Sequence, residues 1–128
     1  MSSSVLDASA LLALLLREPG HDFVAAVMEE GALIGSVNLS EVVGKLQELG
    51  SDEAQIRADI ATARFGIVDF DESLSWQTGL LRQPTRNLGL SLGDRACLAL
   101  AASLGVPAIT AERVWTQLDV GVEVVLCR

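Results

Sequence analysis

Near the start of the chain, a strand pattern passes directly into a helix pattern in the segment Val5-Leu6-Asp7-Ala8-Ser9-Ala10-Leu11-Leu12. Residues 4–6 have the length and aliphatic character of a buried strand, and residues 10–16 are apolar nearly all the way round a helix. Asp7 stands between the two segments, where the strand ends. Because ligands of open parallel sheets bind beyond the carboxyl ends of the strands, Asp7 is the first candidate functional residue.

The alternation of short and long apolar segments continues along the chain. Further strand-like runs lie at residues 32–35, 66–68, 107–109 and 123–126. Helical periodicity is found at residues 10–16, 21–30, 39–49, 53–64, 72–81, 92–104 and 112–118. Strands that alternate with helices form right-handed crossovers and a parallel sheet covered on both faces. The sequence therefore predicts an α/β protein, a three-layer α/β/α sandwich with a central five-stranded parallel sheet, in one domain over residues 1–128.

The helix at residues 10–16 needs apolar partners on more than one side, because one face of a sheet cannot cover it. Two explanations are open. The helix is buried deep inside its own domain, or it forms a dimer seam or a groove for a helix of another protein.

The overall charge argues against nucleic acid as a partner unless metal ions take part. Seventeen acidic residues against nine basic ones give a net charge of −8, which repels phosphates at long range. Divalent cations held by some of these carboxylates would reverse the local charge.

No segment has the pattern of an export signal or of a membrane span. The longest apolar run, residues 10–16, is far shorter than the ~20 residues that cross a bilayer. Cys97 and Cys127 form no metal-binding motif, and we expect them to be free thiols that pack in the core. A cytoplasmic protein with no membrane association is expected.

Three further acids follow predicted strands or open predicted helices, as Asp7 does. Glu41 follows the second strand, in the first turn of the third predicted helix, and Asp94 opens the helix at residues 92–104. Glu112 follows the fourth strand. We expect these carboxylates to meet Asp7 at one edge of the sheet.

Helix capping is the alternative explanation for each acid taken singly. Asn38-x-x-Glu41 and Ser91-x-x-Asp94 have the spacing of capping boxes, and Thr110 could cap a helix with Glu112 in its first turn. Capping does not, however, predict four carboxylates at one edge. Such a group would raise the pKa values of its members unless cations were bound. Oxygen ligands without Cys or His suit Mg²⁺ or Mn²⁺, which can activate water for attack on a phosphodiester.

Together, four segments resemble the PIN-domain family, and most closely its VapC-like toxins of toxin–antitoxin pairs. They are the opening stretch, Asn38-x-x-Glu41-Val42, Leu90-Ser91-Leu92-Gly93-Asp94-Arg95-Ala96-Cys97-Leu98-Ala99-Leu100-Ala101 and Val106-Pro107-Ala108-Ile109-Thr110-Ala111-Glu112-Arg113-Val114-Trp115. The resemblance implies that the catalytic and metal-binding acids are Asp7, Glu41, Asp94 and Glu112. Similar sequences usually have aspartate at the last position, and the extra methylene of Glu112 adds about 1.5 Å of reach.

The same resemblance implies an endoribonuclease that depends on Mg²⁺ or Mn²⁺. It also implies a homodimer and a cognate antitoxin that docks in an apolar groove near the first helices. Arginines that flank the proposed site in sequence are candidates to hold RNA phosphates; they are Arg82, Arg86, Arg95 and Arg113. Thr110 is a further candidate for substrate binding. Trp76 and Trp115 are expected to serve core or interface packing.

Two other functions fit part of the pattern. A PIN-fold binding module without catalysis would result if Glu112 has impaired the metal site. A receiver-type phosphoacceptor domain also has this length and an acidic pocket, but its first strand would need a second acid and its last strand a lysine. The only lysine, Lys45, lies in a predicted helix.

Overall fold

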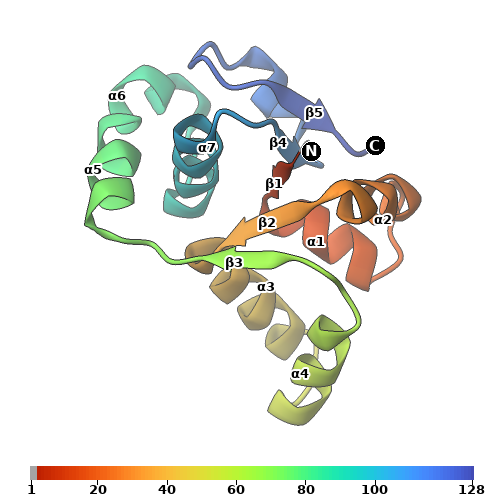
Figure 1. Ribbon diagram of the computed structural model, residues 1–128. Helices are drawn as coiled ribbons and strands as arrows, with labels where there is room; N and C mark the ends of the chain where they lie inside the picture. Colours follow the sequence, from red (N-terminus) through yellow and green to blue (C-terminus); the bar gives the residue numbers. More distant parts are fainter. Residues whose placement is uncertain (1–2) are drawn as a thin grey trace.

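The computed structural model describes residues 3–128, in which five parallel strands are accompanied by seven α-helices. The strands are β1 (Ser4–Leu6), β2 (Ala32–Gly35), β3 (Gly66–Val68), β4 (Ala108–Thr110) and β5 (Val124–Leu126). The helices are α1 (Ala8–Leu15), α2 (His21–Glu30), α3 (Ser36–Glu48), α4 (Glu53–Ala61), α5 (Glu72–Leu80), α6 (Arg82–Thr85) and α7 (Leu92–Leu104). Two 3₁₀ turns, η1 (Arg86–Leu88) and η2 (Arg113–Gln117), complete the chain (Figure 1).

The strand order β3-β2-β1-β4-β5 creates one reversal point in the sheet. The chain first builds outward from β1 to β3, then crosses over to add β4 and β5 on the other side of β1. β1 and β4 are neighbours, with Leu6 paired to Ile109. Ligands of open α/β sheets bind where the strand order reverses. Asp7 and Thr110 therefore stand at the ends of the two strands that flank this point.

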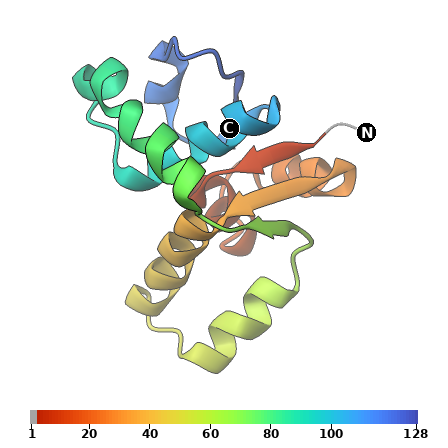
Figure 2. The same cartoon turned by 60° about the vertical axis from the view of Figure 1, so that its left-hand side comes forward.

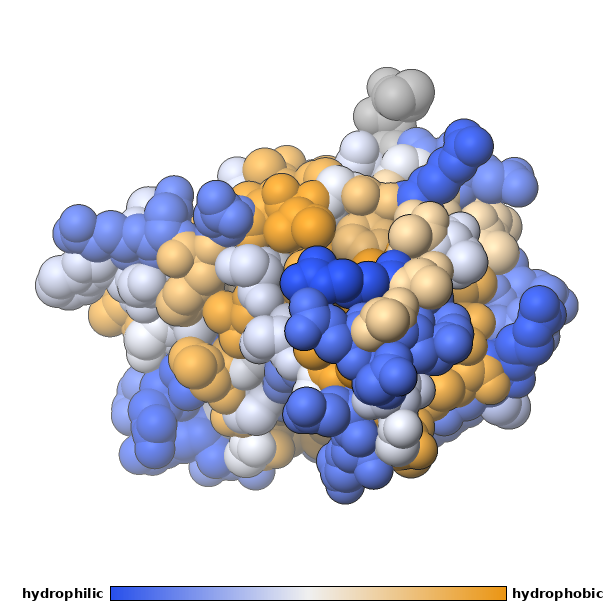
Figure 3. Space-filling view, turned by 90° about the horizontal axis from the view of Figure 1, so that it is seen from below, coloured by the Kyte–Doolittle hydropathy of each residue, from blue (hydrophilic) through white to orange (hydrophobic). Residues whose placement is uncertain are grey.

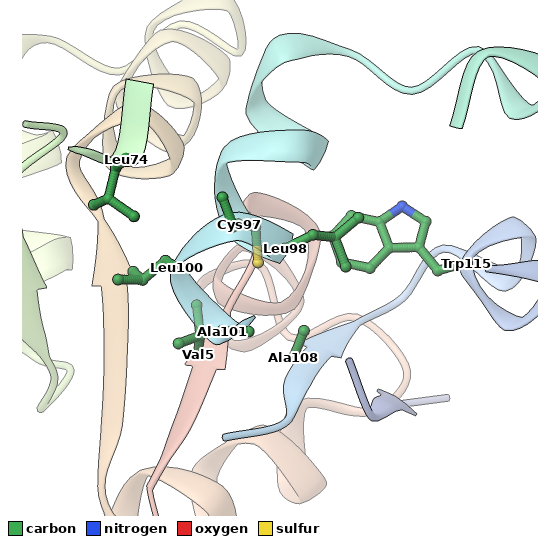
Figure 4. Close-up of a cluster of buried hydrophobic side chains, with 9 residues drawn as sticks. Val5, Leu74, Cys97, Leu98, Leu100, Ala101, Ala108 and Trp115 are labelled. Atoms are coloured by element: carbon green, nitrogen blue, oxygen red, sulfur yellow. The ribbon is translucent and has the colours of Figure 1, made fainter. Parts of the chain in front are cut away.

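Alternate residues of the strands supply the two faces of the sheet. Val5 and Ala108 join α7 and Trp115 in one buried cluster, and Figure 4 shows the indole of Trp115 directed toward α7. Leu6 and Ile109 face the other way and pack with α1 and α2. Figures 1 and 2 show α5 and α7 on one side of the sheet and α1 and α2 on the other. The predicted three-layer sandwich is confirmed.

The apolar α1 is covered inside the domain. Ala10 and Ala13 pack toward α2, and Leu11 lies in a separate cluster with Val42 and Leu46 of α3. Two helices and the sheet thus bury the helix on several sides. Of the two explanations for its composition, burial within the chain is the one the structure supports.

Some element boundaries differ from those predicted. α1 begins at Ala8, because Asp7 caps it, and α3 begins at Ser36, directly after β2. Glu41 is consequently in the second turn of α3, where the prediction put it in the first. The segment predicted as a helix at residues 112–118 is only the 3₁₀ turn η2, and α6 was not predicted.

The topology contradicts the receiver alternative. Receiver-type sheets have the order 2-1-3-4-5, whereas this sheet has the order β3-β2-β1-β4-β5.

Within residues 3–128, no helix is long and apolar enough to cross a bilayer. Cys97 and Cys127 are both buried free thiols, as predicted.

Candidate active site

Asp7 is the most deeply buried of the four candidate acids, with 3% of its surface exposed. It caps α1 by accepting a hydrogen bond on Oδ1 from the backbone N–H of Ala10 at 2.8 Å. The Ser9 hydroxyl donates to the same carboxylate at 2.7 Å, and the Thr110 hydroxyl donates to Oδ2 at 2.6 Å. Three donor atoms on two elements, α1 and β4, thereby fix the position of one carboxylate.

Burial raises the pKa of Asp7 from 3.8 to about 6. The hydrogen bonds from Thr110, Ala10 and Ser9 oppose this effect, and the negative charge of Asp94 adds to it. The expected mutual repulsion of carboxylates is therefore present but is not the main cause. The fold keeps an acid in a place that penalises its ionised form.

Glu41 is held against α7 by a buried amide. The Nδ2 atom of Asn38 donates to Glu41 Oε1 and to the carbonyl of Gly93, each at 3.0 Å. Gly93 allows this close approach, because a Cβ atom built on it would overlap the Glu41 carboxylate. Partial burial raises the pKa of Glu41, opposed by the Asn38 hydrogen bond and assisted by the charge of Asp94.

Asp94 serves as a helix cap and also carries the charge that links the site. Ser91 and Asp94 form the predicted capping box, in which the Ser91 N–H donates to Asp94 Oδ2 at 3.0 Å. Asn38 and Glu41 do not form one, because α3 begins earlier and Asn38 lies inside it. Asp94 raises the pKa of Asp7 and of Glu41.

Burial raises the pKa of Cys97, on the next turn of α7, and the charges of Asp7, Asp94 and Glu41 raise it further. The negative charges of Asp7, Glu41 and Asp94, which come from three segments of the chain, therefore all act at the start of α7.

Glu112 is not drawn into this group. It is an exposed residue that precedes η2 without a side-chain capping bond, so the expected cap by Thr110 on a following α-helix is wrong. Only its backbone N–H is connected to the site, through a 3.0 Å hydrogen bond to Thr110 Oγ1. Across residues 3–128, no three Asp, Glu, His or Cys side chains stand close enough to enclose a cation as they are placed. Asp7, Glu41 and Asp94 have the donor chemistry for Mg²⁺ or Mn²⁺, and closing around an ion would require side-chain adjustment.

The proposed substrate contacts are placed differently from one another. Thr110 is fully buried and its hydroxyl serves Asp7 and Glu112, which makes it a support for the carboxylate. Arg95 is buried and donates from Nη1 to the carbonyl of Thr78 at 3.0 Å. Arg86 is exposed, and Arg113 is exposed with Nη2 3.3 Å from the carbonyl of Arg128. Trp115 is in the core, as expected, whereas Trp76 is 67% exposed.

Sequence reasoning missed two polar side chains that build the site. Ser9 donates to Asp7 and accepts from the N–H of Ala111 at 2.9 Å, which connects α1 to the end of β4. Asn38 bridges α3 and α7. The Asp-x-Ser spacing after a strand was a usable signal for Ser9. The partner of Asn38 is 55 residues away, and no local pattern indicates it.

A family model described as "PIN domain" matches residues 4–121. The chain belongs to the PIN-domain family. A comparison of the sequence of this PIN domain with curated proteins gives no match. Its fold does match solved structures over nearly their full length.

Three of these structures illustrate the likeness. DNA-bound VapBC from Salmonella typhimurium is 17% identical with a TM-score of 0.81 and full coverage of both chains. VapBC2 from Rickettsia felis, bound to a promoter fragment, is 15% identical with a TM-score of 0.79 and coverage of 97% and 98%. VapC20 from Mycobacterium tuberculosis, a toxin that cleaves the sarcin–ricin loop, is 14% identical with a TM-score of 0.73 and coverage of 94% of this chain and 98% of that one. At such identities the likeness establishes the shared fold.

Proposed function

We propose that residues 1–128 form one nuclease domain, which hydrolyses RNA phosphodiester bonds with Mg²⁺ or Mn²⁺ and acts as the toxin of a toxin–antitoxin pair. The observation that carries the proposal is the buried carboxylate of Asp7, with a pKa of about 6, within electrostatic reach of Asp94. A buried acid beside other acids is an unfavourable arrangement for an apo protein. A divalent cation between them removes the penalty.

The chain's own residues have distinct tasks in this proposal. Asp7, Asp94 and Glu41 would hold the ion, with Glu112 as a fourth acid at the exposed rim. Thr110 and Ser9 orient Asp7, and Asn38 orients Glu41. The bound ion would supply an activated water and charge stabilisation at the phosphate. The cytoplasm is the compartment in which such an enzyme meets RNA.

An antitoxin partner is supported by the solved VapBC complexes and by an apolar groove on this chain. The groove, about 580 Å³, lies between α3 and α4 and is lined mainly by Leu39, Val43, Ile56, Ile60 and Ile67. Figure 3, which views the molecule from the α4 side, shows apolar surface next to hydrophilic residues on this side of the molecule. The groove was expected near the first helices, but α1 is covered by α2 and α3. We propose that an amphipathic antitoxin segment docks between α3 and α4 instead.

A homodimer is part of the same proposal. α5 exposes Trp76 and Leu80 by 67% and 71%, and a pair of large apolar side chains on one helix is a candidate dimer contact. Light scattering of purified protein would show a dimer. Trp76→Ala would shift it toward the monomer.

The test of the nuclease proposal is cleavage of labelled single-stranded RNA with Mg²⁺, Mn²⁺ or EDTA. Cleavage should occur with either cation, stop with EDTA, and be lost in Asp7→Asn and in Asp94→Asn. Asp94→Asn keeps a side-chain oxygen that can accept the Ser91 N–H of the capping box, so the loss would not come from unfolding. Cleavage that continues in EDTA would contradict the proposal.

A catalytically impaired binding module is the second candidate. The observation in its favour is the exposed position of Glu112, outside the electrostatic group of Asp7, Glu41 and Asp94. Under this alternative the wild type does not cleave RNA, and Glu112→Asp restores cleavage. Under the nuclease proposal the wild type is already active.

A further inference from the structure

A second hollow in the surface is lined by arginines and adjoins the N-terminal end of α7. Arg82, Arg86 and Arg95 line this arginine cavity of about 290 Å³, together with Thr85, Gly89 and Leu90. They are three of nine basic residues in a chain of net charge −8, and no acidic side chain of the described residues lines the cavity. Such a local excess of positive charge attracts anions.

Arg95 is the buried member of the group, with 8% of its surface exposed. Its Nη1 donates to the carbonyl of Thr78, whereas its Nε has no hydrogen-bond partner. Among residues 3–128, no carboxylate lies within salt-bridge distance of it. A buried guanidinium with neither an opposite charge nor all its donors satisfied carries a desolvation penalty. A bound anion would relieve both deficits.

We propose that the arginine cavity binds a phosphate of the RNA backbone, next to the phosphate that is cleaved. The identity of the ligand rests on the proposed nuclease function. Asp94 and Arg95 are consecutive residues of α7 and point to different sides of the helix. Asp94 acts on Asp7 and Glu41, while Arg95 contacts Thr78 of α5. A helix with its side chains is only ~10 Å across, so one RNA strand that crosses the end of α7 reaches both places.

The chemistry of the cavity favours phosphate over a peptide carboxylate. One guanidinium is enough for a bidentate carboxylate pair, whereas three arginines at one cavity suit a group with several charged oxygens. Two of the three, Arg82 and Arg86, are exposed at the mouth and can close on a mobile chain. Contacts of this kind position a strand without reading its bases. An acidic segment of an antitoxin is the competing ligand.

The site can be tested without reference to catalysis, by NMR of arginine Nε–H groups in the metal-free protein. Inorganic phosphate and a short single-stranded RNA, both in EDTA, are titrated into the wild type. We expect saturable shifts of the Arg95 Nε–H signal with both ligands. The double variant Arg82→Ala/Arg86→Ala should lose most of the shift. The matched control Arg57→Ala/Arg64→Ala, which removes the same charge from exposed positions on and after α4, should keep it.

Kinetics separate substrate binding from a structural role. In Arg82→Ala/Arg86→Ala we expect KM for RNA to rise about tenfold at unchanged kcat, since the contact of these two arginines with one phosphate is lost. The dependence of log affinity on log salt should become shallower by about 0.7, the value for one phosphate on a single strand. Both quantities should stay at wild-type values in Arg57→Ala/Arg64→Ala.

The outcomes distinguish this site from the nuclease proposal. Shifts at Arg95 with RNA but no cleavage would support the phosphate site and contradict the nuclease function. Cleavage with no shift at Arg95 and an unchanged KM in the double variant would support the nuclease function and contradict the phosphate site. Shifts with inorganic phosphate alone, or with an acidic peptide and not with RNA, would overturn the assignment to the RNA backbone.

Discussion

The hydroxyl of Thr110 donates a 2.6 Å hydrogen bond to Oδ2 of Asp7 across 103 residues of sequence. The two residues end neighbouring strands, β4 and β1, at the point where the strand order reverses. The same hydroxyl accepts the backbone N–H of Glu112. One threonine thus connects the buried acid to the loop that carries the exposed one.

Replacing Thr110 by valine should weaken the site while preserving its shape. The Thr110 hydrogen bond lowers the pKa of Asp7, so Thr110→Val should raise that pKa further above its present value of about 6. At neutral pH less of the carboxylate would be ionised, and Mn²⁺ affinity should fall. Carboxyl ¹³C NMR in EDTA measures the pKa. Thr110→Ser, which keeps the hydroxyl, is the control, and equal pKa values in Ser and Val variants would contradict the prediction.

The stability of the metal-free protein should fall as pH rises, because of Asp7. Its folded pKa of about 6 exceeds the unfolded value of 3.8, so the protonated form is favoured by folding. The contribution is fully present below pH 3.8 and is lost as pH rises through 6, by about 3 kcal/mol. Chemical denaturation of wild type and Asp7→Asn in EDTA measures the difference between them. Asp7→Asn should become the more stable protein above pH 6, and parallel stability curves would refute the prediction.

Gly93→Ala should displace Glu41 without unfolding the protein. The added Cβ overlaps the Glu41 carboxylate, which is the movable end of a side chain, so the strain can be relieved by moving that acid. We expect RNA cleavage to drop about tenfold, with stability reduced by less than about 1 kcal/mol. Gly44→Ala is the matched control on α3, because a Cβ there meets nothing within 4 Å. It should stabilise the helix by up to ~1 kcal/mol and leave activity unchanged. A fully active Gly93→Ala would argue against a role for Glu41.

Removing the Glu112 side chain should matter less than changing Asp94. Glu112 is exposed, whereas the Asp94 charge reaches Asp7 and Glu41. In calorimetric titrations we expect Glu112→Ala to weaken Mn²⁺ binding by less than about tenfold. Asp94→Asn should exceed the ~100-fold loss that changes around a metal site can cause. Equal losses in the two variants would show that Glu112 is a full ligand.

The strands and the α7 capping box could be predicted because their causes are local. Short aliphatic runs between turn residues define β1 and β3, and Ser91 with Asp94 satisfies a helix start with three-residue spacing. The fate of Arg95 could not be predicted, because its burial depends on α5 packing on α7. The sequence names Arg95 only as a candidate to hold RNA phosphates beside the acids, and does not indicate that it is buried in the arginine cavity.

The sequence indicates candidate residues for the proposed site more readily than it indicates their arrangement. Strand ends and helix starts indicate Asp7, Glu41 and Asp94 as candidates, and in the structure the charge of Asp94 acts on the other two. The position of Glu112 depends on whether the segment after β4 forms an α-helix. It forms the shorter turn η2, so the last acid stays exposed.

Anomalous X-ray diffraction from crystals grown with Mn²⁺ can show whether Asp7 and Asp94 share a divalent cation. We expect an anomalous peak between the two carboxylates, within coordination distance of an oxygen of each, and no such peak in Asp94→Asn. A wild-type crystal with Mn²⁺ bound elsewhere, or with no peak at Asp7, would contradict it.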